Sequence, residues 1–439
     1  MSDRALRQQR GVMLPVNLFL IYLFLFTMQS TIGLSATVQH YLDLEEKYGA
    51  HNYHPMPVVL ERGEGVFVWD VEGKRYYDFL SGYSAVNQGH CHPKIVEAFI
   101  RQSRKLTLTS RAFHSDKLGE YAAFITRYFG YDKVLPMNTG VEAVETAIKL
   151  CRKWAYEVKG IPDGKAQIVV CEGNFHGRTT GVISFSSDPS SNTHFGPYLP
   201  GFIRIPYNDA AALEKALKEN EHIAGFLVEP IQGEAGVVVP DDGYLTRTKQ
   251  LCAEANVLFI ADEIQTGLAR TGKLLACDHE NVRPDILILG KALSGGMLPV
   301  SAVLADDSIM LTIKPGEHGS TYGGNPLACQ TAITSLEVLK DEQMAENATA
   351  MGKLLREGLE SLQSKHIETV RGKGLLNAIV ISHAHADAAW DLCLQLKENG
   401  LLAKPTHGDK IRFAPPLVIN KEQVEECVGI ISKSLTCLD

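Results

Sequence analysis

The sequence lacks several features that mark particular protein classes. Its 439 residues hold 43 Lys and Arg against 51 Asp and Glu, so the formal charge of −8 provides no basic field to gather nucleic acid. A composition of 45% hydrophobic and 21% charged residues excludes a disordered chain and a multi-span membrane protein. The nine cysteines are odd in number, widely scattered and include no Cys-x-x-Cys pair, which is typical of reduced thiols and not of a disulfide framework or a zinc ribbon. A small-molecule ligand is therefore the expected partner.

Common nucleotide and hydrolase motifs are also missing. The chain has no Gly-x-Gly-x-x-Gly fingerprint and no Gly-x-Ser-x-Gly elbow. Residues 267–273 (GLARTGK) have the spacing of a P-loop, but Leu274 stands where a P-loop needs Ser or Thr to hold magnesium. His90, Cys91 and His92 have no further ligands at the usual spacing. We expect no P-loop nucleotide and no metal.

The N-terminal segment lacks charge. Residues 11–42 contain no Asp, Glu, Lys or Arg, and residues 18–26 (LFLIYLFLF) are apolar throughout. Three arginines precede this run and small residues follow it, which is typical of a targeting segment. We therefore expect residues 1–36 to be a leader that is either a targeting segment or disordered. We expect no stable membrane association of the mature protein. The leader resembles a secretory segment, whereas the scattered thiols favour a reducing interior, so we expect the mitochondrial matrix or the cytoplasm.

From residue 37 onward, short apolar runs alternate with amphipathic helical stretches. Several runs (GFLVEP, VLFIAD, ILILG) are apolar on both faces, which predicts an α/β fold with a mainly parallel sheet covered by helices on both sides. The predicted strands cover residues 133–137, 166–171, 202–205, 224–229, 257–262, 285–289 and 300–304. The last hundred residues predict a smaller α+β unit with a helix over 342–364, strands at 368–371, 375–381 and 411–419, a helix over 387–399, and a terminal helix.

Two charged residues follow predicted buried strands. Asp262 ends VLFIAD, and Lys291 follows ILILG. Alone, such an Asp is usually a helix cap and such a Lys a surface charge. Together they indicate chemistry, because an ammonium in a buried setting is costly unless it is used, for example as a Schiff base. Pyridoxal phosphate fits this pattern, since a buried carboxylate favours its protonated ring nitrogen.

The same cofactor needs a phosphate site and a ring partner. Residues 138–142 (NTGVE) lie where a predicted strand turns into a helix, whose first backbone N–H groups bind phosphate well. Phe175, after the strand ending in IVVCEG, is an aromatic residue available to stack on the ring.

Residues 258–296 (LFIADEIQTGLARTGKLLACDHENVRPDILILGKALSGG) resemble the signature of the class III aminotransferases, a fold type I family that depends on pyridoxal phosphate. Further blocks, among them VLPMNTGVEAVETA, VEPIQGEAGVVVP and KPGEHGSTYGGNPLAC, are similar to the ornithine-specific branch of that family. The resemblance runs from about Tyr41 to the C-terminus. It implies a seven-stranded, mainly parallel sheet in a large cofactor-binding domain (residues 86–333) and a smaller α+β domain (residues 37–85 and 334–439).

The resemblance also implies roles around the cofactor. Lys291 would form the Schiff base and then act as general acid and base, while Asp262 would pair with the pyridine nitrogen. Gln265 would contact the phenolic oxygen and Phe175 would stack on the ring. Gly140 and Val141 would bind the phosphate through their backbone, together with Thr321 from the partner subunit of a homodimer with active sites at its interface.

For the substrates, the resemblance implies transfer of the δ-amino group of L-ornithine to 2-oxoglutarate by a ping-pong mechanism. The products would be glutamate, and glutamate 5-semialdehyde, which cyclises to pyrroline-5-carboxylate. Arg412 would bind the α-carboxylate of 2-oxoglutarate, and Glu234 would neutralise Arg412 while ornithine is bound. Tyr53 and Arg178 would hold the distal end of ornithine, and Tyr83 would narrow the pocket. His176 departs from the Trp of some ornithine-specific members and matches the wider family.

Other interpretations remain open from the sequence. Glu234 with Arg412 could be a structural ion pair, and Tyr83 could be a core residue. N-acetylornithine or γ-aminobutyrate could replace ornithine as amino donor. An aminomutase or a decarboxylase on the same scaffold would not need 2-oxoglutarate, and a cofactor-binding regulatory protein would not need Lys291.

Overall fold

The structure is a computed structural model that describes residues 34–382 and 386–439. The expected leader lies outside these residues, apart from its last three positions. The backbone contacts divide the described residues into two units, residues 34–62 with 69–74 and residues 63–68 with 75–382 and 386–439. The first contains α2 (Ala36–Tyr48), which begins where Ser35 Oγ accepts a hydrogen bond from the Val38 N–H. Strands β1 (Leu60–Glu64) and β2 (Phe67–Asp70) each contribute residues to both units.

A seven-stranded sheet forms the centre of the second unit. Strand β10 runs antiparallel to both of its neighbours, and the other pairs are parallel, which confirms the mainly parallel sheet. The strand order is β4 (Lys133–Met137), β10 (Ser301–Ala305), β9 (Ile286–Leu289), β8 (Leu258–Asp262), β7 (Ile223–Val228), β5 (Gln167–Cys171) and β6 (Phe202–Ile205). Each of the seven predicted strands lies within a residue or two of its observed position.

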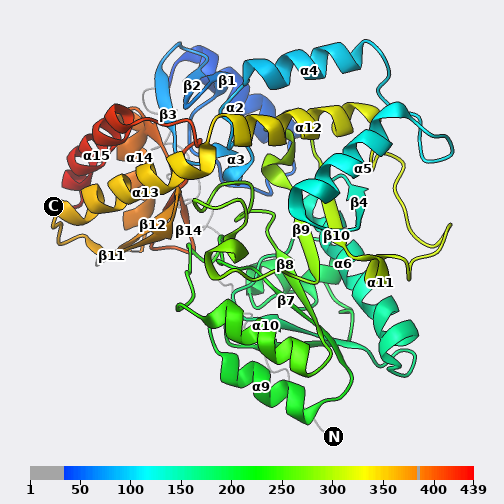
Figure 1. Ribbon diagram of the computed structural model, residues 1–439. Helices are drawn as coiled ribbons and strands as arrows, with labels where there is room; N and C mark the ends of the chain where they lie inside the picture. The colour runs from blue at the N-terminus through cyan, green and yellow to red at the C-terminus, as the bar shows by residue number, and fades with distance from the viewer. Residues whose placement is uncertain (1–33, 383–385) are drawn as a thin grey trace, which may run out of the picture. The chain divides into compact units, whose positions relative to one another are not determined.

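Helices cover both faces of this sheet because successive strand residues point to opposite sides. In β8, Ile260 packs in the cluster that contains α6 (Gly140–Trp154), whereas Phe259 packs in the cluster with α9 (Ala210–Glu219) and α10 (Tyr244–Glu254). Figure 1 shows α6 on one side of the strands and α9 and α10 on the other. Sheets of this kind bind ligands at the carboxyl ends of their parallel strands.

A second, antiparallel sheet lies in the C-terminal part. Its order is β11 (Ile367–Lys373), β12 (Leu376–Ile381), β15 (Lys410–Phe413) and β14 (Lys404–Thr406). Helix α13 (Met344–Ser361) packs against β11 and α15 (Lys421–Leu435). The prediction of a strand over 411–419 is wrong in its second half, because β15 ends at Phe413. Pro415 and Pro416 follow, and proline has no N–H group to donate to a neighbouring strand.

The remaining elements connect these layers. They are β3 (Arg75–Asp78), α3 (Ser81–Ser84), α4 (Pro93–Ser103), α5 (Asp116–Phe129), the π-helix η1 (Ala155–Lys159), α7 (Thr180–Ile183), α8 (Pro189–Asn192), the 3-10 helices η2 (Ala276–Glu280), η3 (Lys291–Ser294) and η4 (Thr436–Leu438), α11 (Asp307–Met310), α12 (Pro326–Asp341), α14 (Ala388–Glu398), α15 (Lys421–Leu435) and β13 (Leu401–Leu402). Among the described residues, no helix is both long and apolar enough to cross a bilayer.

Candidate active site

A cavity of about 210 Å³ opens at the carboxyl ends of β7, β8 and β9. Seven of the residues predicted for the site come together in its lining: Gly140, Val141, Phe175, Glu234, Asp262, Gln265 and Lys291. Because these residues are far apart in the sequence, the parallel sheet is what brings them together.

Lys291 begins η3, directly after β9 and Gly290. Its backbone adopts φ +43°, a left-handed conformation that is unfavourable for a residue with a side chain and is typical of functional sites. Burial lowers the pKa of the Lys291 ammonium from 10.5 to about 8, against the opposing effect of the Glu234 carboxylate. The free amine, which a nucleophile or general base requires, is therefore far more populated near neutral pH than in an ordinary lysine.

Asp262, the last residue of β8, is buried and held from two sides. Its Oδ2 lies 2.7 Å from His176 Nδ1, and its Oδ1 accepts a hydrogen bond of 3.1 Å from the Ile264 N–H. Burial opposes the charge on His176, but the hydrogen bond to Asp262 and the charge of that carboxylate raise the pKa of the imidazole. His176 Nε2 is buried without a hydrogen-bond partner among the described residues.

Glu229 is a site residue that the sequence reasoning missed. It follows β7 directly, so the strand-end argument applied to Asp262 and Lys291 would have found it. Its Oε2 accepts a hydrogen bond of 3.0 Å from the Phe175 N–H, and its Oε1 accepts one of 3.4 Å from the Gly233 N–H. Burial raises the pKa of Glu229 to about 7. This carboxyl group links the loop of Phe175 to the loop of Glu234.

The first turn of α6 faces the same cavity. Thr139 caps the helix with Glu142 in a capping box: the Glu142 N–H donates to Thr139 Oγ1, and Glu142 Oε2 accepts from the Thr139 N–H. An α-helix offers no internal acceptor for the N–H groups of its first residues, here Gly140 and Val141. With the helix dipole, these amides form a site for an anion such as phosphate.

Phe175 and Arg178 lie on the loop after β5. Phe175 lines the cavity, and the Arg178 guanidinium carbon lies 5.5 Å from the centroid of its ring. Arg178 is exposed and donates a hydrogen bond of 2.8 Å from Nη1 to Ser191 Oγ. The ring of Phe175 is thus available on the cavity wall, and a cation lies next to it.

Glu234 and Arg412 form an ion pair, the contact that the family resemblance implies. Arg412 Nη1 donates to Glu234 Oε1 at 2.8 Å, and the guanidinium is 2% exposed. Burial acts to raise the pKa of Glu234, but Arg412 and Lys291 together lower it, so this carboxyl group is ionised. Arg412 Nε is buried without a hydrogen-bond partner among the described residues, so Glu234 does not saturate the guanidinium.

Tyr83 lies beside this pair, with the Arg412 guanidinium carbon 5.2 Å from the centroid of its ring. It is presented by four consecutive residues, Ser81 to Ser84, with φ between +50° and +70°. Three of these four residues carry side chains, which makes the turn energetically costly. Asp78 stabilises the turn by accepting hydrogen bonds of 2.9 Å from the N–H groups of Leu80 and Ser81.

Two predicted residues lie elsewhere. Tyr53 belongs to the first unit, where 71% of its side chain is exposed. Thr321 is exposed in the segment before α12 and is not among the residues that line the cavity. Their roles stay predictions.

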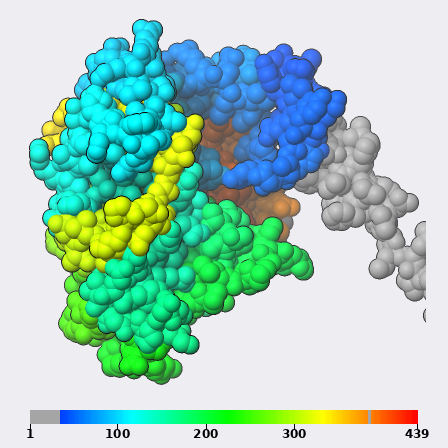
Figure 2. Space-filling model, turned by 90° about the vertical axis from the view of Figure 1, so that its right-hand side faces the viewer, coloured from blue at the N-terminus to red at the C-terminus, as the bar shows by residue number. Residues whose placement is uncertain are grey.

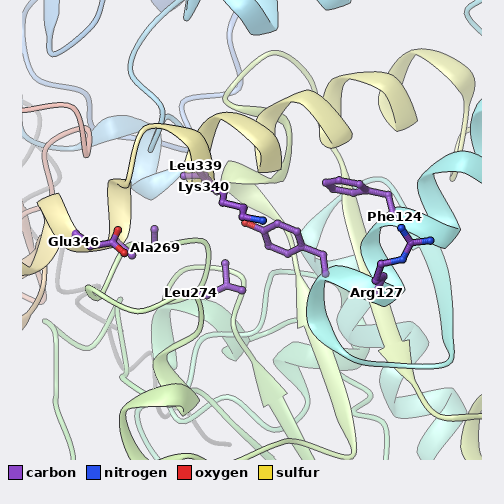
Figure 3. A pocket seen from close by; sticks show the side chains of 9 residues that line it. Phe124, Arg127, Ala269, Leu274, Leu339, Lys340 and Glu346 are labelled. Atoms are coloured by element: carbon purple, nitrogen blue, oxygen red, sulfur yellow. The ribbon is translucent and has the colours of Figure 1, made fainter.

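A larger cavity of about 540 Å³ lies elsewhere in the second unit. Figure 3 shows its lining side chains, which come from α5, the end of α12, the start of α13 and the loop around Leu274. It shares no residue with the cavity of Lys291. Asp262, Glu234 and Lys291 all line the smaller cavity, so we assign the chemistry to the smaller cavity.

Comparison with known proteins agrees with this geometry. The family model "Aminotransferase class-III" matches residues 48–435. The chain belongs to the class III aminotransferase family. This is a family of pyridoxal phosphate-dependent transferases, which confirms the fold, the enzyme class and the cofactor predicted from the sequence.

Several individual relatives are more similar to this chain than the family as a whole requires. The chain is 64% identical to the mitochondrial ornithine aminotransferase of Rattus norvegicus and 65% identical to that of Drosophila melanogaster, covering 90% of each protein and 90% and 89% of this chain. The ornithine aminotransferase of Toxoplasma gondii superposes with a TM-score of 0.90 at 48% identity, over 94% of this chain and 97% of that one. An acetylornithine aminotransferase of Elizabethkingia anophelis superposes with a TM-score of 0.84 at 62% identity, over 91% and 99%.

The cavity of this class III aminotransferase fits pyridoxal phosphate. It combines a lysine of lowered pKa, a buried carboxylate, a helix start with open N–H groups and an aromatic ring. The unpartnered His176 Nε2 adds a buried polar atom that the protein alone does not satisfy. Pyridoxal phosphate has an aldehyde for the lysine, a ring nitrogen for the carboxylate, a phosphate for the helix start and a flat ring for the aromatic side chain.

Proposed function

We propose that this chain is an ornithine δ-aminotransferase that passes the δ-amino group of L-ornithine to 2-oxoglutarate. The observation that carries the proposal is the Glu234–Arg412 ion pair in the same cavity region as Lys291. When Glu234 neutralises Arg412, the site suits the δ-amino end of ornithine, which has no carboxylate. When Glu234 moves away, Arg412 can bind the α-carboxylate of 2-oxoglutarate. The strong similarity to proteins named ornithine aminotransferase supports the same substrate.

The residues around the cofactor cavity would have the following roles. Bound pyridoxal phosphate supplies an aldehyde and an electron sink. Lys291 Nζ moves a proton at the substrate carbon that carries the amino group, which its lowered pKa favours. Asp262, oriented by His176, holds a proton at the ring nitrogen. The N–H groups of Gly140 and Val141 bind the phosphate.

The other residues would position the reactants. Phe175 packs on the ring, and Gln265 contacts the side of the phenolic oxygen. Tyr53 and Arg178 bind the distal carboxylate and amino group of ornithine, while Tyr83 narrows the pocket beside Arg412.

We also propose a homodimer with its active sites at the interface, in which Thr321 of one protomer completes the phosphate site of the other. The segment around Thr321 supports this, because the neighbouring Tyr322 is 58% exposed. Figure 2 shows part of this stretch, in yellow, on the surface. The large domain would span residues 86–333, and the small domain would combine 37–85 with 334–439. Sedimentation at several protein concentrations tests the dimer, and a monomer with full activity would exclude it.

The proposed location is the mitochondrial matrix. Several relatives are named as mitochondrial, which supports the organelle. Determining the N-terminal sequence of the native protein tests whether residues 1–36 are removed. Retention of the full apolar run in the mature protein would contradict the proposal.

The substrate is tested by comparing three amino donors at equal concentration: L-ornithine, N-acetyl-L-ornithine and γ-aminobutyrate. We expect ornithine to give the highest kcat/KM. N-acetylornithine is the second candidate, because a solved structure 62% identical to this chain is that of an acetylornithine aminotransferase. A higher kcat/KM for N-acetylornithine would replace ornithine in the proposal, and turnover without 2-oxoglutarate would indicate a different reaction class.

A further inference from the structure

Gln265 lies between the two members of the ion pair. Its Nε2 donates to Glu234 Oε1 at 3.1 Å, and its Oε1 accepts from Arg412 Nη1 at 3.3 Å. The orientation of the amide follows from its partners, because a carboxylate only accepts and a guanidinium only donates. Glu234, Arg412 and Gln265, here called the gate, therefore form one closed set of hydrogen bonds.

The position of this amide depends on a glycine. A Cβ at position 233 would lie 1.5 Å from Gln265 Oε1, so any other residue at 233 would displace the amide. The backbone of this loop is held independently of the gate, because Glu229 Oε1 accepts from the Gly233 N–H and Thr406 Oγ1 donates to the Glu234 carbonyl at 2.9 Å. The Glu234 carboxylate, in contrast, accepts its hydrogen bonds within the described residues from the side chains of Gln265 and Arg412.

Gln265 also lines the cavity that contains Lys291 and Asp262. An amide nitrogen carries two protons, so Gln265 reaches both the gate and the cofactor cavity. If a dicarboxylate binds Arg412 in place of Glu234, Gln265 Nε2 loses its carboxylate acceptor in the gate. It is then free to donate fully toward the phenolic oxygen of the cofactor.

We propose that Gln265 is a positioning residue that couples the gate to the cofactor. With the gate closed on Glu234, the amide is shared with that carboxylate. With the gate opened by a dicarboxylate, the amide donates to the phenolic oxygen and favours its ionised form. This inference rests on the proposed function, since it assumes that a dicarboxylate binds Arg412 in the second half-reaction.

The test is a pH titration of the cofactor absorbance in the holoenzyme, with and without glutarate. Glutarate has the two carboxylates of 2-oxoglutarate but neither a keto nor an amino group, so it binds without reacting. We expect glutarate to lower the spectroscopic pKa of the wild-type holoenzyme by about 0.4 to 1 pH unit, the size of one hydrogen bond. In Gln265→Ala this shift should disappear while glutarate still competes with 2-oxoglutarate.

Gly233→Ala is a second variant that keeps Gln265 but displaces its amide, and the shift should disappear there too. Gly119→Ala is the matched control, because a Cβ at residue 119 meets no atom within 4 Å; its shift should equal the wild-type value. If Gln265→Ala fails to fold or to bind glutarate, Gly233→Ala decides. The inference is overturned if glutarate causes no shift in the wild type, or if the deciding variant keeps it. A holoenzyme that shows the shift but does not react with ornithine would refute the proposed function alone.

Discussion

The two halves of the active site are built in different ways. Around the cofactor cavity, Asp262, Glu229 and Lys291 come at or directly after strands of one sheet, and Gly140 begins a helix that packs on that sheet. In the gate, Glu234 and Gln265 come from two loops, and Arg412 comes from β15 of the C-terminal antiparallel sheet. Backbone ladders hold the first half, and hydrogen bonds between side chains of 2.8 to 3.3 Å hold the second.

This difference suits the two tasks. Groups that act on the cofactor must stay in place through both half-reactions, and strand ends provide that rigidity. The gate must accept substrates of different charge at one point, and a set of side chains can rearrange without moving the sheets. Glu229 connects the halves, because its carboxyl group accepts hydrogen bonds from the loops of Phe175 and Gly233.

The largest effect is expected in the cofactor half. Lys291→Ala should lower the turnover of ornithine by at least about 10³-fold, because the proton at the reacting carbon then has no carrier. The fold should persist by circular dichroism. The exposed Lys273 provides the control, and Lys273→Ala should keep wild-type activity. Turnover of the Lys291 variant within tenfold of the wild type would contradict the assignment.

The next effect is on stability and concerns Glu229. Its native pKa of about 7 exceeds the ordinary 4.5, so folding favours the protonated acid and the free energy of unfolding falls as pH rises from about 4.5 to 7. Glu229→Gln should remove this dependence, which amounts to at most about 3 kcal/mol. Denaturant unfolding of the cofactor-free protein at pH 5 and pH 7.5 measures it. An unchanged pH dependence in the variant would show that Glu229 does not titrate in this range.

In the gate we expect a change of specificity. Glu234→Ala leaves Arg412 open, so donors with an α-carboxylate near the reacting amine should gain relative to ornithine. The ratio of kcat/KM for glutamate to that for ornithine should rise by about tenfold, or about 1.4 kcal/mol. Glu172→Gln, at an exposed glutamate of a neighbouring loop, should leave the ratio unchanged. An unchanged ratio in Glu234→Ala would show that the Glu234–Arg412 ion pair has a structural role and does not control specificity.

The smallest effect is expected at the start of α6. Thr139→Ala removes one half of the capping box and should lower the free energy of unfolding by about 1 kcal/mol. The affinity for pyridoxal phosphate should fall only slightly, because the N–H groups of Gly140 and Val141 remain. A large loss of cofactor affinity would mean that the Thr139 side chain itself takes part in the phosphate site.

The strand-end half of the site was largely predictable from the sequence. Buried apolar runs ending in Asp262 and before Lys291 place both residues at one edge of a parallel sheet, and Glu229 follows the same rule. Helix α12 was not predicted, because its buried face includes Thr331 and Ser335, which look polar in the sequence. In the structure their hydroxyl groups donate to the carbonyls of Leu327 and Ala292.

The gate could not be derived from periodicity or spacing. Arg412 lies 178 residues from Glu234, and only the packing of β15 brings the two together. The contact of Gln265 with both residues depends on the missing side chain of Gly233, and a lone glycine in a loop does not reveal what it approaches. The left-handed turn that presents Tyr83 is likewise a product of tertiary structure, since serine and tyrosine do not favour it.

The most direct measurement of the central claim is the half-reaction of the holoenzyme with L-ornithine in the absence of a keto acid. We predict that the visible band of the aldehyde form of the cofactor is lost, that the amine form accumulates, and that one equivalent of glutamate 5-semialdehyde is formed per active site. Addition of 2-oxoglutarate should then restore the original spectrum. An unchanged spectrum with ornithine, together with full conversion by N-acetylornithine or γ-aminobutyrate, would contradict the account.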